Sequence, residues 1–227
     1  MALHVVLPAA GNGQRMQSST PKQYLRLGEI SVIEHTVTAF LEFEPVERIV
    51  CATDPQDLQF DHCFFSSHRR VVRCDGGAKR SQSVLNGLEA LRLDGAATDD
   101  WVMVHDVARP LITQQELATL WLTAQASAGQ GAILVLPSVD SLRVSTDGES
   151  LSGIAERSRI YRAQTPQCFQ LGALIAAIEA YSAATDESEA MIKSGYRPRL
   201  VTGRATNLKL TYPEDLMIAQ AILWSRQ

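Results

Sequence analysis

Aromatic residues and positive charge are both scarce in this chain of 227 residues. Aromatic side chains make up 6% of it, and the formal net charge at pH 7 is −4. Proteins that bind nucleic acid usually present a basic face with aromatic side chains that stack on bases. We therefore expect no nucleic-acid partner. A phosphate-binding pocket stays open as an interpretation, because such a pocket needs only a few well-placed cations.

Long hydrophobic runs are lacking as well. No stretch approaches the roughly 18 apolar residues that a membrane-spanning helix needs. The apolar run Leu3–Leu7 follows Met1 almost directly, without the basic region and cleavage site of a signal peptide. We expect a cytoplasmic protein with no membrane partner.

Cysteine is present without the spacing of a metal site. The four cysteines are Cys51, Cys63, Cys74 and Cys168, and they form no CxxC pair and have no histidines at zinc-ligand intervals. We expect reduced thiols, as in most proteins of the cytoplasm.

Short apolar runs alternate with helical patterns along the chain. Five runs have the character of strands buried on both faces: Leu3–Leu7, Arg48–Thr53, Val71–Cys74, Trp101–His105 and Ala132–Leu136. Helical spacing of apolar residues predicts helices over Ile30–Phe43, Ser81–Leu93, Gln114–Ala128 and a closing helix that reaches about Trp224. This alternation predicts βαβ units, and therefore a mostly parallel sheet with helices on both faces and ligands beyond the carboxyl ends of its strands.

Two capping patterns mark the starts of predicted helices. Ser31 with Glu34 forms a capping box before the first helix, and Thr211 with Glu214 forms another before the closing helix. Pro213 is tolerated there, because the first turn of a helix does not need its N–H group.

Residues 138–163 break the alternation. A half-polar segment leads to the tip Ser-Thr-Asp-Gly-Glu-Ser, and the chain returns through Arg157, Arg159 and Arg162. Turn residues between two such segments predict a hairpin, which we expect to project from the main sheet as an arm. An isolated hairpin is marginally stable in water, so we expect the arm to pack on something else, such as a second subunit. An irregular surface loop is the alternative.

A glycine-rich segment follows the first predicted strand. It reads Pro8-Ala9-Ala10-Gly11-Asn12-Gly13-Gln14-Arg15-Met16 and leads to Pro21-Lys22-Gln23. Small residues let the backbone approach a ligand, and successive N–H groups can surround a phosphate. Met16 replaces the third glycine of a dinucleotide fingerprint, and no Walker loop occurs. Two cations after such a turn favour phosphoryl or nucleotidyl transfer, which depends on neutralising charge around phosphorus. A plain strand-to-helix turn with solvated basic residues is the alternative.

This segment closely resembles the 2-C-methyl-D-erythritol 4-phosphate cytidylyltransferases of the non-mevalonate isoprenoid pathway. The resemblance continues in the family's order through Gly76-Gly77 with Arg80, Ser83-Val84, His105-Asp106-Val107-Ala108-Arg109-Pro110, Gln164-Thr165-Pro166-Gln167, Thr185-Asp186-Glu187 and Asn207-Leu208-Lys209. Each block alone is a weak signal, but together they cover nearly the whole chain and are highly specific.

The resemblance implies two parts of a nucleotide site. Arg15 and Lys22 match the family's catalytic cations, and the triphosphate-holding loop corresponds to Pro8, Ala9, Ala10, Gly11 and Gly13. Gly76, Gly77 and Ser83 match the wall against the cytosine. Some relatives carry an acidic residue after the glycine pair, whereas this chain has Ala78, so base selection here is expected to rest on backbone groups.

The resemblance also implies an acceptor site. Asp106 follows a strand end, where it contacts substrate in the family and is assigned here as a ligand of Mg²⁺, the expected cofactor. Arg109, Thr165 and Thr185 match substrate-binding positions, and Arg157 and Lys209 match the cations that position the attacking phosphate. That phosphate carries about −1.5 to −2 charges, so it needs cations to approach a triphosphate. His105 is expected to be a packed histidine and not a base. Without the resemblance, Arg157 reads as part of a solvated basic face.

These observations predict an α/β fold: a single Rossmann-like nucleotidyltransferase domain over residues 1–227, with a mostly parallel sheet and a protruding β-hairpin arm over 138–163 that joins a homodimer. The expected reaction moves a cytidylyl group from CTP to 2-C-methyl-D-erythritol 4-phosphate. One alternative is a cytidylyltransferase for another polyol phosphate such as ribitol 5-phosphate. Another is a catalytically silent nucleotide-binding protein on the same fold.

Overall fold

A seven-stranded sheet forms the centre of the protein. The structure, a computed structural model, describes residues 1–11, 14–16, 18 and 20–226, so Gly13 of the predicted loop lies outside the described residues. The strands of the sheet, in spatial order, are β11 (Arg199–Thr202), β7 (Ala132–Pro137), β10 (Tyr161–Gln170), β6 (Trp101–Val104), β1 (Leu3–Pro8), β4 (Val46–Thr53) and β5 (Val71–Asp75). β10 is antiparallel to both of its neighbours, and the other pairs are parallel.

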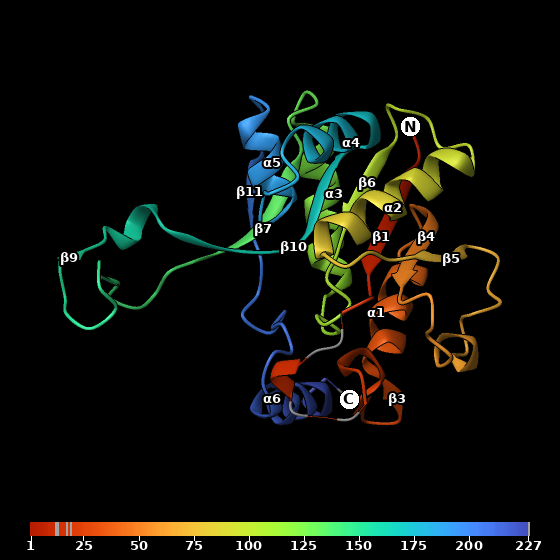
Figure 1. The fold of residues 1–227 in the computed structure, drawn as a ribbon, viewed down its shortest axis with the longest axis horizontal. Helices are drawn as coiled ribbons and strands as arrows, with labels where there is room; N and C mark the ends of the chain where they lie inside the picture. Colours follow the sequence, from red (N-terminus) through yellow and green to blue (C-terminus); the bar gives the residue numbers. More distant parts are fainter. Residues whose placement is uncertain (12–13, 17, 19, 227) are drawn as a thin grey trace.

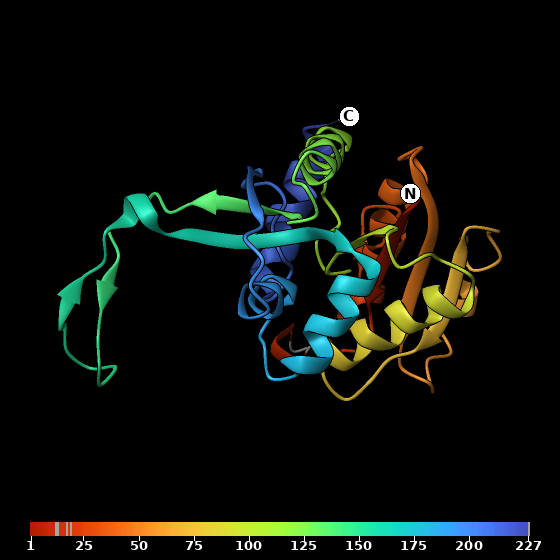
Figure 2. The same cartoon turned by 90° about the horizontal axis from the view of Figure 1, so that it is seen from above.

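Helices cover both faces of this sheet (Figures 1 and 2). On one face lie α1 (Val32–Leu41) and α3 (Gln114–Gln125), whose apolar sides share a core cluster with Leu3, Val5 and Leu7. On the other lie α2 (Arg80–Leu93), α4 (Leu171–Ala180) and α5 (Glu187–Lys193), which share a second cluster with Val6, Val50 and Val102. Alternate residues of a strand point to opposite faces of the sheet. A strand that is apolar throughout therefore contributes side chains to both core clusters.

The mostly parallel α/β fold predicted from the alternation is confirmed. All five predicted strands are present in the sheet, and each of the four predicted helices exists within a few residues of its expected bounds. The capping box at Ser31 is also present, because the Glu34 carboxylate accepts a hydrogen bond from the Ser31 backbone N–H at 2.7 Å. No helix in the described part of the chain is long and apolar enough to cross a membrane.

The start of the closing helix corrects one prediction. α6 (Pro213–Trp224) has Tyr212 at its N-cap, and the carboxylate that reaches back is that of Asp215 and not Glu214. Asp215 accepts from the backbone N–H groups of Thr211 and Tyr212 at 2.7 and 2.8 Å. The cap lies one residue later than the Thr211 pattern predicted, because Asp215 is the carboxylate that reaches the N–H groups before the helix.

The predicted arm is a long projection from the sheet. β7 runs out into it and β10 returns from it, and its far end carries the short antiparallel pair β8 (Arg143–Val144) and β9 (Gly153–Ile154) (Figure 2). β10 is therefore both the return of the arm and a central strand of the sheet. A second small pair, β2 (Arg26–Leu27) with β3 (Ile30–Ser31), lies beside α6.

We predict that Gly131, just before β7, tolerates no side chain. Its φ is +79°, and an added Cβ would lie 2.7 Å from the Cys168 carbonyl oxygen and against the Phe169 ring. Gly95 has φ +97° with open space around it, so it is a matched control. Gly95→Ala should cost about 1–2 kcal/mol for the left-handed backbone, and Gly131→Ala should cost about 1–3 kcal/mol more for the clash. Urea unfolding midpoints measure both, and equal losses would contradict this account of β7–β10 packing.

Candidate functional site

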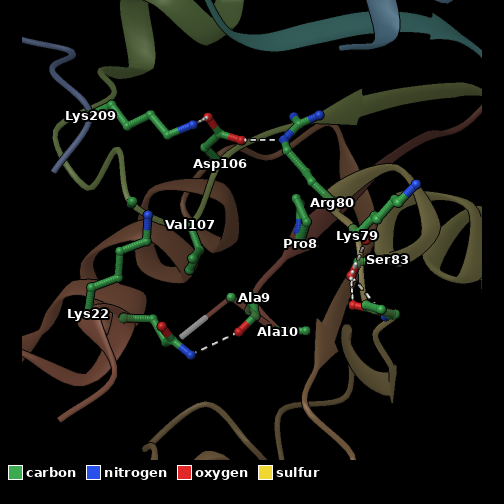
Figure 3. A pocket seen from close by; sticks show the side chains of 15 residues that line it. Pro8, Ala9, Ala10, Lys22, Lys79, Arg80, Ser83, Asp106, Val107 and Lys209 are labelled. Atoms are coloured by element: carbon green, nitrogen blue, oxygen red, sulfur yellow. Dashed lines mark hydrogen bonds and ion pairs between the residues drawn. The ribbon is translucent and has the colours of Figure 1, made fainter. Parts of the chain in front are cut away.

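Two adjoining pockets lie at the carboxyl ends of β1, β4, β5 and β6. The inner pocket, of about 180 Å³, is lined by Pro8, Ala9, Ala10, Gly11, Lys22, Gln23, Gly77, Ala78, Lys79, Arg80, Ser83, Asp106, Val107, Ala108 and Lys209 (Figure 3). The outer pocket, of about 860 Å³, adds Arg15, Asp54, Pro55, Gly76 and Thr211. The two share Ala10, Gly11, Lys22, Gly77 and Ala78, so they form one continuous site.

Lys22 is fixed to the small-residue loop by its neighbour. It begins a short 3-10 turn that follows Pro21, and the buried Gln23 side chain donates to the Ala9 carbonyl at 2.9 Å. Burial lowers the pKa of Lys22, and the positive charges of Lys209 and Arg15 lower it further. Asp106 opposes this shift by raising the pKa of Lys22. Lys22 lines both pockets, Lys209 lines the inner one and Arg15 the outer one, so the three cations face one continuous site.

The wall opposite Lys22 is a backbone turn with no room for side chains. The Gly77 N–H donates to Ser83 Oγ at 2.9 Å, which ties the turn to the first turn of α2. A Cβ on Gly76 would lie 2.5 Å from the Ala10 Cβ and 3.1 Å from Ser83 Oγ. The turn therefore packs directly against the loop after β1, and Ala78 adds no polar group to the pocket that the turn and the loop enclose.

Asp106 joins cations from two distant parts of the chain. Arg80 Nε donates to Asp106 Oδ1 at 2.8 Å, and Lys209 Nζ lies 2.7 Å from Asp106 Oδ2 (Figure 3). Arg109 Nε is 3.9 Å from the same Oδ2. Burial alone would raise the pKa of Asp106, but Arg80 and Lys209 outweigh it and hold the pKa well below its ordinary value. Asp106 is therefore a carboxylate at neutral pH.

A buried hydrogen-bond chain fixes the backbone of Asp106. The Asp106 N–H donates to Thr165 Oγ1 at 3.0 Å, Thr165 Oγ1 lies 3.1 Å from His105 Nδ1, and His105 Nε2 lies 3.1 Å from the Arg109 carbonyl. The carbonyl only accepts, so Nε2 carries the proton and Nδ1 accepts from the Thr165 hydroxyl. Burial lowers the pKa of His105 to about 4, which keeps the ring neutral. These contacts favour the packed role expected for this histidine.

The loop that carries Lys209 is pinned from three sides. Asn207 Nδ2 donates to the Thr165 carbonyl at 2.9 Å, and the Arg109 guanidinium donates to the Asn207 carbonyl at 2.7 Å. Gln164 Nε2 donates to the carbonyls of Arg204 and Asn207 at 3.0 and 3.2 Å. These side chains fix the loop through hydrogen bonds to backbone carbonyls. The Lys209 side chain remains at the inner pocket, which it lines.

The surroundings of Asp106 do not fit a protein-built metal centre. Among the described residues, no three His, Cys, Asp or Glu side chains gather as a metal-ligand set. Asp106 is the one acidic side chain that lines the inner pocket in the described part of the chain, and each of its oxygens contacts a cation. Its role as a Mg²⁺ ligand stays a prediction, which this arrangement does not favour.

The predicted site residues divide into those that meet at the pockets and those that do not. Eleven of them line the pockets: Pro8, Ala9, Ala10, Gly11, Arg15, Lys22, Gly76, Gly77, Ser83, Asp106 and Lys209. Arg109 and Thr165, also predicted to bind substrate, do not line either pocket and lie behind Asp106. Thr185 is exposed beside the pocket wall, where its hydroxyl donates to Glu189 at 2.8 Å. Arg157 lies on the arm and donates to the Val139 carbonyl at 2.8 Å, outside both pockets.

Sequence reasoning gave no role to Arg80, Lys79 or Glu187. Arg80 and Lys79 line the inner pocket, and Glu187 is a buried carboxylate that holds Arg80. Arg80 and Glu187 both fall in blocks that resemble the family, but their pairing spans 107 residues, and no local spacing predicts it.

Comparisons with known proteins agree on one family. The family model for 2-C-methyl-D-erythritol 4-phosphate cytidylyltransferase, IspD, matches residues 3–225. A protein of that name from Tolumonas auensis is 41% identical over 98% of this chain and 96% of its own, and one from Pseudomonas aeruginosa is 44% identical over 96% and 95%. A crystal structure of a 4-diphosphocytidyl-2C-methyl-D-erythritol synthase superposes with a TM-score of 0.85 at 37% identity, covering 98% of each chain. With the loop, the glycine turn and the two lysines placed as described, this chain belongs to the 2-C-methyl-D-erythritol 4-phosphate cytidylyltransferase family.

Proposed function

We propose that this chain transfers a cytidylyl group from CTP to 2-C-methyl-D-erythritol 4-phosphate, releasing pyrophosphate and giving 4-diphosphocytidyl-2-C-methyl-D-erythritol. Membership of the family supports the two substrates. The observation that carries the proposal is the meeting of Lys22 and Lys209 in one pocket, between a small-residue loop and the tight Gly76–Gly77 turn. Such a pocket suits two anions that must approach one phosphorus.

The proposed step needs no covalent intermediate on the protein. An oxygen of the acceptor phosphate attacks the α-phosphorus of CTP and forms a new P–O bond. The bond from that phosphorus to the bridging oxygen of the β-phosphate breaks, and pyrophosphate leaves with the electron pair. Arg15 and Lys22 stabilise the added charge on the phosphoryl oxygens, and Lys209 offsets the repulsion between the acceptor and the triphosphate.

Selection of cytosine is assigned to Gly76, Gly77 and Ser83. Their turn leaves a narrow wall of backbone groups, which accommodates a pyrimidine and excludes a larger purine. Asp106, Arg109, Thr165 and Thr185 are assigned to the acceptor side. Thr165 would act mainly by holding the Asp106 backbone, since it is buried behind the pocket.

The expected cofactor is Mg²⁺, which offsets phosphate charge in nucleotidyl transfer. Magnesium commonly binds through substrate phosphates and water with few protein ligands. That mode agrees with a pocket in which Asp106 is already paired with Arg80 and Lys209. We assign the cation to the nucleotide and no step to a protein-held metal.

We further propose that the enzyme is a cytoplasmic homodimer joined by its arms. The arm exposes apolar side chains far from the sheet: Val139, Val144, Leu151 and Ile154 are 73%, 44%, 72% and 77% exposed. Apolar groups gathered on a thin projection favour contact with another protein surface. Arg157 lies on the same arm and outside the pockets of its own chain, so it would complete the site of the partner.

The substrate assignment predicts the outcome of a pyrophosphate-release assay that crosses four nucleotides with two acceptors. CTP with 2-C-methyl-D-erythritol 4-phosphate should exceed every other pair by at least about 100-fold in kcat/KM, because the site is built around specific polar contacts. Equal or faster release with ribitol 5-phosphate would favour the other polyol phosphate. No release with any pair would favour a silent nucleotide-binding protein.

Lys22→Ala should lower kcat by about 100- to 1,000-fold, the loss typical when one group that stabilises the transition state is removed. Arg48→Ala is the matched control, because it removes one positive charge at the far end of the sheet, where Arg48 pairs with Asp94. The control should keep normal kcat, and both variants should keep the native circular dichroism spectrum. Near-normal turnover of Lys22→Ala would remove Lys22 from the mechanism.

Mixing two inactive variants tests whether Arg157 acts on the partner. Chains with Arg157→Ala and chains with Lys22→Ala should each be nearly inactive alone. After they exchange subunits, half of the dimers are mixed and hold one site with both residues intact, so about a quarter of wild-type activity should return. No recovery, with subunit exchange confirmed by mass spectrometry, would mean that Arg157 serves its own chain or no site.

A further inference from the structure

A buried carboxylate outside the proposed chemistry holds one wall of the pocket. Glu187 is 2% exposed and stands at the first turn of α5. Its two oxygens face the two terminal nitrogens of Arg80, at 2.6 and 3.1 Å. This is the two-pronged pairing for which a guanidinium group is suited.

The third guanidinium nitrogen of Arg80, Nε, contacts Asp106 at the pocket. Arg80 Nε donates to Asp106 Oδ1 at 2.8 Å, while Asp106 Oδ2 lies 2.7 Å from Lys209 Nζ. The four side chains therefore form one chain of alternating charge, Glu187–Arg80–Asp106–Lys209. It begins in a buried position and ends at the proposed acceptor cation, whose side chain is 35% exposed.

The anchor is itself fixed to the central sheet. Gln167 of β10 donates to Asp186 Oδ2 at 3.0 Å and accepts from the Ser188 N–H at 2.7 Å. Glu187 is thereby held between two residues whose positions are tied to a strand. Thr185 directly precedes Asp186, so the same attachment to β10 also limits where Thr185 lies.

Stability alone does not account for the ion pair between Glu187 and Arg80. A buried ion pair loses much of its attraction to the desolvation of both charges, so an apolar pair is often as stable. Here Glu187, together with Asp106, offsets the charge of Arg80, which lines the same pocket as Lys22 and Lys209 and would otherwise compete with them for phosphate. A neutralised Arg80 can instead hold Asp106 in one orientation.

We propose that Glu187 is a positioning residue for cytidylyl transfer: through Arg80 it fixes Asp106, and so fixes where the Lys209 ammonium lies. This inference rests on the proposed function. It assigns Glu187 an effect on the chemical step and on the acceptor, with little effect on CTP binding, because the Glu187 carboxylate pairs with Arg80 and not with the Gly76–Gly77 turn or the described residues of the loop after β1.

The test compares Glu187→Gln, Arg80→Gln and the double variant with wild type. In Glu187→Gln we expect kcat per folded chain to fall about 10- to 100-fold, as when catalytic groups shift by about 1 Å. The KM for CTP should stay within about threefold. The double variant should lose no more than Arg80→Gln alone, because Glu187 acts only through Arg80.

Asp100→Asn is the matched control for removing a buried carboxylate. Asp100 lies at the opposite end of the sheet, where it accepts from the N–H groups of Ala2 and Ala97 at 2.7 and 2.8 Å. It should lower the urea midpoint and leave kcat per folded chain unchanged. If Glu187→Gln does not fold, the double variant, with two facing amides, measures what the Glu187–Arg80 pair as a whole contributes to kcat, and normal kcat in it overturns the inference.

The outcomes separate the two proposals. A wild-type chain that releases no pyrophosphate with any pair of substrates overturns the proposed function. An active wild type with normal kcat in folded Glu187→Gln or in the folded double variant overturns the inference about Glu187. Additive losses in the double variant would also overturn it, since they would show that Glu187 acts independently of Arg80.

Discussion

The mutual repulsion of cations is the constraint around which this site is built. Lys22, Lys209 and Arg15 lie near enough for the latter two to lower the pKa of Lys22, in addition to the effect of its burial. Cations placed this close repel one another until anionic substrates bind, so other groups of the protein must hold them in position before binding. Asp106 meets that need on one side, because its two oxygens contact Arg80 and Lys209 while its backbone is fixed from below by Thr165.

The fold makes this gathering possible because strands of one direction end at one edge. Loops after β1, β5 and β6 deliver the small-residue loop, the glycine turn and Asp106 to the same place. β10 runs the other way, and it contributes through side chains along its length and not through its end. Gln164 and Thr165 fix the Lys209 loop and Asp106, and Gln167 fixes the segment around Glu187. One reversed strand thus supports residues from three separate segments.

That division explains what the sequence could and could not predict. Five of the strands that run in one direction, β1, β4, β5, β6 and β7, are short apolar runs, mostly with helices between them, so their presence and direction are readable from the pattern. The sixth, β11, reads Arg-Leu-Val-Thr, is mostly exposed and was not predicted. β10 reads Tyr-Arg-Ala-Gln-Thr-Pro-Gln-Cys-Phe-Gln, and its polar residues hide a buried strand because Gln164 and Thr165 bond to loop backbone groups that are distant in sequence. α4, Leu-Gly-Ala-Leu-Ile-Ala-Ala-Ile-Glu-Ala, is apolar nearly all round and shows no clear helical face. The pocket-lining motifs were identifiable through their resemblance to the family, but the pairing of Arg80 with Asp106 and Glu187 depends on tertiary structure.

Repulsion between cations also offers an explanation for the arm. A single chain holds three of the four predicted catalytic cations together, while the fourth, Arg157, stands on a projection rich in exposed apolar groups. Keeping one cation on another subunit would limit the repulsion that each folding chain must overcome, since the full set meets only after assembly. The apolar surface of the arm would then supply the association energy, and hydrophobic contact between chains would offset part of the electrostatic cost of the completed site. Both features would then limit repulsion between cations. The arm would do so between subunits, and the Glu187–Arg80 pair would do so within one chain.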